Sequence, residues 1–125
     1  MVVLVDSSIW IDYFRQGEER LGGLLAADAV IQHPYVTAEI GMGSFRSLAD
    51  RTKTIDFLES FTQATLPRDG ELSLFVGEHD LFGTGLGFPD ASLLLATLSV
   101  SGASLWTRDR KLLNEAARLE TPLFR

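Results

Sequence analysis

The sequence contains no cysteine, only two histidines and only two lysines. The absence of cysteine excludes disulfides, thiolate metal ligands and a cysteine nucleophile, and it suits a reducing compartment. The N-terminus lacks the basic and apolar regions of a signal peptide. The longest apolar stretch, residues 93–100, contains Thr97 and Ser99 and is too short to cross a bilayer. We therefore expect a soluble cytoplasmic protein with no membrane contact.

Positive charge is also scarce, with 11 Lys and Arg against 17 Asp and Glu, and the net charge is −6. An acidic protein is not expected to bind nucleic acid unless cations neutralise a cluster of its carboxylates. Four acidic residues described below are candidates for such a cluster. Without their four negative charges the net charge would be −2 instead of −6. The charge of the chain therefore does not exclude a nucleic-acid substrate.

The 125 residues have the length of one domain, which we expect to span residues 1–125. Apolar runs predict strands at residues 2–5, 29–32, 64–66, 104–107 and 121–124. Helical spacing predicts a helix that ends at Gly17, one that starts near Thr37, and others at 18–27, 50–62, 71–82, 90–100 and 109–118. This alternation is typical of an α/β domain in which helices cover both faces of a mainly parallel sheet.

Acidic residues stand where such a fold places its chemistry. Asp6 directly follows the first predicted strand, and Asp109 follows the strand 104–107 by two residues. Glu39 and Asp90 fall in or just before the first turns of two predicted helices. Parallel sheets bind ligands at the carboxyl ends of their strands, and right-handed crossovers can bring these positions to one edge.

A cluster of four carboxylates would repel itself, so that some would be protonated or cations would bind. Ligands that are all oxygen favour Mg²⁺ or Mn²⁺ over zinc. Two such ions can hold a phosphodiester and deprotonate a water for in-line attack. This chemistry needs neither a histidine base nor a serine nucleophile.

Helix capping is the competing explanation for the same residues. Asp6, Asp90 and Asp109 are each good N-cap residues. Glu39 is favourably placed for the dipole of its predicted helix. Capping suffices for any one of them, and spacing alone does not decide between a structural and a chemical role.

Four segments resemble the motifs of the PIN domain, and within it of the VapC toxins of bacterial and archaeal toxin–antitoxin pairs. The segments are DSSIWID at 6–12, TAEI at 37–40, GLGFPDASLL at 85–94 and LWTRD at 105–109. Their order and spacing match those of the family, and the resemblance covers essentially the whole chain.

The resemblance implies a three-layer PIN-like fold with a central sheet of four to five short strands. It also implies an endoribonuclease that depends on Mg²⁺ or Mn²⁺ and leaves a 5′-phosphate and a 3′-hydroxyl. The catalytic and metal-binding cluster would consist of Asp6, Glu39, Asp90 and Asp109. Ser7 and Thr107 would support this cluster, with Thr107 hydrogen-bonded to Asp6.

The same resemblance implies three kinds of partner. The substrate would be RNA, with tRNA or ribosomal RNA as the expected class. The protein would form a homodimer. A cognate VapB-like antitoxin would cover the active-site groove and place a basic side chain among the carboxylates.

Other residues with chemical potential have simpler explanations. Arg108 and Arg110 flank Asp109 and are candidates for contacts with RNA phosphates. Trp10 lies at helical spacing beside a predicted strand, so we expect it in the core rather than stacked on a base. His33 has no partner pattern, and we expect an ordinary structural or surface histidine.

Three alternative functions compete with a ribonuclease toxin. A receiver-like phosphoacceptor domain has the same alternation of elements, but it needs a lysine at a strand end, and Lys53 and Lys111 fall on predicted helices. A non-catalytic PIN-like module would bind only a partner protein. A PIN nuclease outside toxin–antitoxin pairs would act in RNA processing.

Overall fold

The sheet of this protein has four parallel strands in the order β3-β2-β1-β4, in a computed structural model that describes residues 1–125. The strands are β1 (Val2–Val5), β2 (Val30–Gln32), β3 (Thr62–Gln63) and β4 (Ala103–Trp106). A one-residue parallel bridge joins Leu105 of β4 to Leu123, which adds the C-terminal segment to the edge of the sheet. The predicted α/β class with a parallel central sheet is confirmed.

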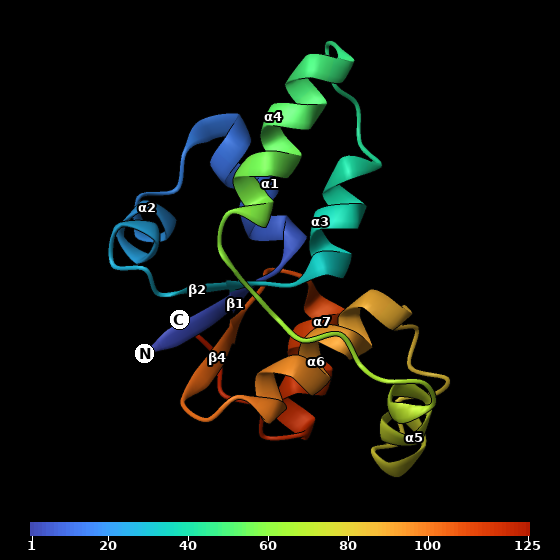
Figure 1. Cartoon of the computed structure of the whole chain (residues 1–125). Helices are drawn as coiled ribbons and strands as arrows, with labels where there is room; N and C mark the ends of the chain where they lie inside the picture. The colour runs from blue at the N-terminus through green and yellow to red at the C-terminus, as the bar shows by residue number, and fades with distance from the viewer.

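The chain also forms seven helices (Figure 1). They are α1 (Ser7–Gln16), α2 (Glu19–Ala26), α3 (Pro34–Gly41), α4 (Leu48–Glu59), α5 (Glu71–Glu78), α6 (Phe88–Ser99) and α7 (Arg110–Arg118). In Figure 1, α1 to α4 lie on one side of the sheet, and α6 and α7 lie on the other. None of the helices combines the length and the hydropathy of a membrane span.

The two sides follow from the strand order. The crossovers from β1 to β2 and from β2 to β3 move in one direction along the sheet, whereas the crossover from β3 to β4 returns past β1. Right-handed crossovers that run in opposite directions place their helices on opposite faces. The result is the predicted arrangement of three layers.

Several predicted boundaries were wrong for local reasons. The third strand lies at Thr62–Gln63 rather than at 64–66. Its two residues pair with Ile31 and Gln32 of β2. Helix α3 begins at Pro34 rather than near Thr37. Proline is favoured at the first helical position because it needs no backbone donor there, so this residue starts a helix as well as ending a strand. The segment 121–124 forms only the single bridge to β4.

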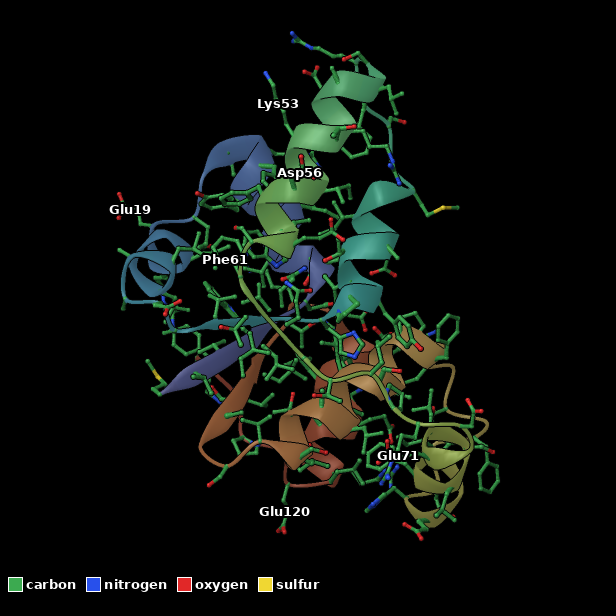
Figure 2. All side chains as sticks on the ribbon, viewed as in Figure 1. Glu19, Lys53, Asp56, Phe61, Glu71 and Glu120 are labelled. Atoms are coloured by element: carbon green, nitrogen blue, oxygen red, sulfur yellow. The ribbon has the colours of Figure 1, made fainter.

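The core is centred on β1, in which Val3, Leu4 and Val5 have no exposed surface. A strand covered on both faces by helices is expected to be apolar throughout. Trp10 is also fully buried, as predicted, and its ring stacks on Phe61 with 5.9 Å between centroids. In Figure 2, Phe61 lies at the base of α4.

A chain of buried hydrogen bonds fixes the end of β2 against α1 and α3. The indole Nε1 of Trp10 donates to Oε1 of Gln32 at 2.9 Å. The amide Nε2 of Gln32 donates in turn to Oγ1 of Thr37 at 2.9 Å. All three residues are buried, so each polar atom depends on these partners. The network therefore ties the end of β2 to both α1 and α3.

Replacing Gln32 should destabilise the fold, because Gln32→Leu leaves the Trp10 donor and the Thr37 hydroxyl without this partner. We expect a loss of about 1–3 kcal/mol in the free energy of unfolding, measured by urea denaturation. Gln16→Leu, at the exposed end of α1, is the control and should change stability by less than about 0.5 kcal/mol. Equal stability of the two variants would show that the buried network contributes nothing.

Candidate active site at the edge of the sheet

The strand order reverses between β1 and β4, and this point defines the candidate site. The chain moves from β1 to β2 to β3 on one side, and β4 then pairs with β1 on the other. Val5 is paired with Trp106, and the backbone N–H of Asp6 donates to the carbonyl of Trp106 at 2.9 Å. Ligands of open parallel sheets bind at such a reversal, outside the carboxyl ends of the strands. Asp6 and Thr107 are the residues that follow these two strands.

Asp6 is buried, with 3% of its surface exposed, and hydroxyl groups surround its carboxylate. Oδ2 accepts from Oγ1 of Thr107 at 2.6 Å and from Oγ of Ser8 at 3.0 Å. The predicted hydrogen bond from Thr107 is therefore present. The predicted support from Ser7 is weaker, at 3.4 Å to Oδ1, and Ser8 is the closer serine.

Capping does not account for the burial of Asp6. The residue stands at the N-cap position of α1, but its side chain forms no capping hydrogen bond. A buried carboxylate is costly unless it is paired or well hydrogen-bonded. The position therefore holds a charge that the helix itself does not use.

Thr107 also connects Asp6 to Asp109. Its hydroxyl donates to Asp6 and accepts from the backbone N–H of Asp109 at 3.0 Å. Asp109 caps α7, because its Oδ1 accepts from the N–H of Leu112 at 2.9 Å. Capping is thus correct for Asp109, but it uses only one of the two carboxylate oxygens. Oδ2 accepts no hydrogen bond and is free for a ligand.

Asp90, like Asp6, does not cap its helix. Helix α6 begins at Phe88, its N-cap is Gly87, and no side chain caps it. Burial, followed by the negative charges of Asp6, Asp109 and Glu39, raises the pKa of Asp90 from 3.8 to about 6. Asp90 therefore lies within electrostatic reach of each of the other three predicted acids, although the four come from separate parts of the chain.

Glu39 lies in the second turn of α3 and is exposed. Its expected position in the first turn was wrong, because α3 begins at Pro34. His33 caps this helix, with its Nδ1 accepting from the N–H of Tyr35 at 3.0 Å. The helix dipole acts mainly on the first turn, so it does not explain Glu39. Of the four acids, only Asp109 retains a capping role.

The donors fit a hard divalent cation, and they do not form a closed cage. All are carboxylate oxygens, the ligands that Mg²⁺ prefers. No group of three acidic or histidine side chains is close enough, as they stand, to bind one ion together. Mg²⁺ commonly keeps several waters and binds through one or two carboxylates and a substrate phosphate. The site fits that open form of binding.

The two arginines beside Asp109 differ from each other. The guanidinium of Arg108 forms ion pairs with Asp12 and Glu18, and the hydrogen bond to Glu18 raises the pKa of Arg108 most. Its charge is therefore used within the protein, on the side of α1 and α2. Arg110 is exposed at the first position of α7 and forms no salt bridge. Of the two, Arg110 is the one available to a phosphate.

Sequence reasoning missed two neighbours of the site, although His33 follows a predicted strand. His33 is buried at the end of β2, its Nε2 has no partner, and burial lowers its pKa to about 4. It is therefore neutral at pH 7. Lys111 extends from α7 across Gly85, with Nζ only 3.2 Å from where a Cβ of Gly85 would stand. Gly85 lies in the loop before α6, so Lys111 connects α7 to this loop.

The fold and the acidic edge define a PIN-like domain, and solved structures agree. The crystal structure of PAE2754 from Pyrobaculum aerophilum has a TM-score of 0.65, with 22% identity over 92% of this chain and 84% of that chain. The crystal structure of FitAcB from Neisseria gonorrhoeae also has a TM-score of 0.65, with 15% identity over 99% of this chain and 97% of that chain. At these identities the likeness concerns the fold.

Curated relatives identify the family. Ribonuclease VapC32 from two strains of Mycobacterium tuberculosis is 39% identical to this chain over 111 residues, which is 89% of this chain and 87% of the relative. No family model matches the chain. The chain belongs to the VapC ribonuclease family. The resemblance to VapC toxins that the four motifs indicated is thereby confirmed.

Removing the charge of Asp90 should stabilise the metal-free protein at neutral pH. The pKa of Asp90 is higher in the folded state, at about 6, than its ordinary value of 3.8. The protonated side chain of Asp90 therefore adds to the stability of the fold. This contribution is fully present below about pH 4 and is lost as the pH rises through about 6. Asp90→Asn should gain about 1–2 kcal/mol at pH 7, a value reduced for partial solvation.

Urea denaturation in EDTA between pH 4 and pH 8 measures this gain, which should shrink as the pH falls. Asp69→Asn, in the exposed segment before α5, is the matched control and should show no such trend. A destabilised Asp90→Asn protein at every pH would contradict a cluster of mutually repelling charges.

Proposed function

We propose that this protein is a metal-dependent endoribonuclease toxin of a toxin–antitoxin pair, which hydrolyses phosphodiester bonds in RNA. The observation that supports it best is the electrostatic coupling of Asp90 to Asp6, Asp109 and Glu39 at the strand reversal. Membership in a family of ribonucleases supports the reaction class. The proposed substrate class is structured RNA such as tRNA or ribosomal RNA.

Asp6, Glu39, Asp90 and Asp109 would hold Mg²⁺ or Mn²⁺. When bound, the cation would supply positive charge to the phosphate and lower the pKa of a water. In this hydrolysis a water would attack phosphorus, the bond between phosphorus and the 3′ oxygen would break, and a 5′-phosphate and a 3′-hydroxyl would remain. The water loses a proton in this step, and the departing oxygen gains one.

The chain contributes position and proton affinity to this reaction. Ser8 and Thr107 hold the Asp6 carboxylate in one orientation, so it needs no rearrangement when substrate arrives. Asp109 is fixed through its cap and keeps Oδ2 free. Asp90, whose pKa is raised to about 6, is the carboxylate best able to hold a proton near neutral pH.

The proposed antitoxin would exploit the same negative charge. Asp90, Asp109 and Glu39 form no salt bridge within the chain, and Arg108 is already paired with Asp12 and Glu18. An arginine from a partner could bind two of these carboxylates and exclude a cation. We also propose that the protein forms a homodimer, as its family resemblance implies.

Asp6→Asn should abolish cleavage while the fold survives, because asparagine can still accept the hydroxyl hydrogen bonds but carries no charge. The assay is cleavage of total RNA and tRNA with Mg²⁺, with Mn²⁺ and with EDTA. We expect discrete, metal-dependent products from the wild type and a loss of at least roughly 100-fold in the variant.

Asp56→Asn is the matched control, since Asp56 is exposed on α4 (Figure 2) and far in sequence from every acid of the site. It should cleave like the wild type. Unchanged cleavage by Asp6→Asn, with folding verified by circular dichroism, would contradict the proposed role of this carboxylate. No cleavage by any protein would favour a module that only binds a partner.

Cation binding should be measurable without RNA. A ligand that binds only the folded state raises stability by about 2.7 kcal/mol at 100 times its dissociation constant. Mn²⁺ should therefore raise the melting temperature of the wild type and of Asp56→Asn. The double variant Asp6→Asn/Asp90→Asn should lose this increase. An equal increase in all three proteins would place the cation elsewhere.

A further inference from the structure

Beside the acids, three aromatic rings run from the interior to the surface. His33 is buried, and its ring centroid lies 5.0 Å from that of Tyr35. The Tyr35 ring lies 5.4 Å from that of Phe88, at an interplanar angle of 80°. Phe88 ends the row and keeps 63% of its surface exposed. A phenylalanine that is packed on one ring and otherwise open to solvent is available to a flat ligand.

This ring pair stands on the two helices that carry Glu39 and Asp90. Tyr35 and Glu39 are four residues apart on α3, and residues at this spacing share a helix face. Phe88 and Asp90 lie two residues apart in the first turn of α6, so their side chains point to different sides of that helix. The contact between Tyr35 and Phe88 bridges the two helices that carry Glu39 and Asp90. A group bound to these rings would lie beside the face of α3 that also carries Glu39.

Two aromatic rings elsewhere in the protein already pack against a cation. The guanidinium of Arg20 covers the rings of Trp106 and Phe124, at 5.3 and 4.8 Å from their centroids. No arginine or lysine lies over Tyr35 or Phe88. A perpendicular pair also forms a corner, in which a planar molecule can stack on one ring while the edge of the molecule meets the other.

We propose that Tyr35 and Phe88 stack an unpaired nucleobase next to the scissile phosphate, so that the enzyme acts on single-stranded or unstacked nucleotides. This inference rests on the proposed ribonuclease function. Bases in a duplex have no free face, whereas unpaired bases stack readily on aromatic side chains. The stacking contact would add affinity that the acidic surface does not provide. Phe88 would then be a substrate-selecting residue rather than a catalytic one.

Phe88→Leu removes the ring but retains an apolar side chain at an exposed position, so the fold should be unaffected. Phe82→Leu is the matched control, because Phe82 is exposed to a similar degree, 68% against 63%, and has no aromatic neighbour. Binding is measured by fluorescence anisotropy with random-sequence single-stranded RNA and with duplex RNA in Mg²⁺. The Asp6→Asn background prevents turnover.

We expect Phe88→Leu to weaken binding of single-stranded RNA by roughly 5- to 150-fold and to leave duplex binding unchanged. Phe82→Leu should bind both RNAs like its parent. Phe88→Trp should retain binding and act as a reporter, since both natural tryptophans are buried. Its emission should be quenched by single-stranded RNA and not by duplex RNA.

Equal effects of Phe88→Leu and Phe82→Leu would overturn the inference. So would a loss of self-association in Phe88→Leu, measured by sedimentation, with unchanged RNA binding, because the ring would then be a contact between proteins. Cleavage by the wild type separates these outcomes from the proposed function. If the wild type cleaves and Phe88→Leu binds normally, only the stacking role fails. If the wild type neither cleaves nor binds RNA, both fail.

Discussion

The burial of the Asp6 carboxylate is the constraint on which the site depends. A carboxylate that loses water must gain equivalent hydrogen bonds. Thr107 provides one from the end of β4, and Ser8 provides another from the first turn of α1. These bonds require β1, β4 and α1 to meet at one place. The parallel pairing of β1 with β4 brings them there, so the order of the strands and the chemistry of the site are linked.

Asp109 and Asp90 are placed around the buried Asp6 carboxylate. Asp109 is joined to Asp6 through the hydroxyl of Thr107. Asp90 approaches from the opposite layer, and its raised pKa records the combined effect of burial and three negative neighbours. Such an arrangement is unfavourable for stability and therefore calls for a function that uses it. Concentrated negative charge is useful where a cation must be held beside a phosphate.

Local patterns predicted the parts of the fold that depend on local interactions. The run 2–5 predicted β1 because a strand buried on both faces must be apolar throughout. Asp6 and Asp109 were located because each stands at or near the end of such a strand, whereas Thr107 was indicated by the resemblance to the family motifs. The start of α3 was placed too late, because Pro34 can both end a strand and begin a helix.

Contacts between distant segments could not be predicted in the same way. The ion pairs of Arg108 with Asp12 and Glu18 join residues 96 and 90 positions apart. The contact of Tyr35 with Phe88 depends on how α3 packs near α6. Both change the interpretation of the site, since the ion pairs remove a predicted phosphate contact and the ring contact adds an aromatic surface.

The most direct test of the central claim is the chemistry of the RNA ends after cleavage by the wild type, read by end-specific ligation with Mg²⁺ and with EDTA. We predict 5′-phosphate and 3′-hydroxyl ends that form only with the cation. Ends with a 2′,3′-cyclic phosphate, formed equally in EDTA, would contradict a reaction run by these four carboxylates.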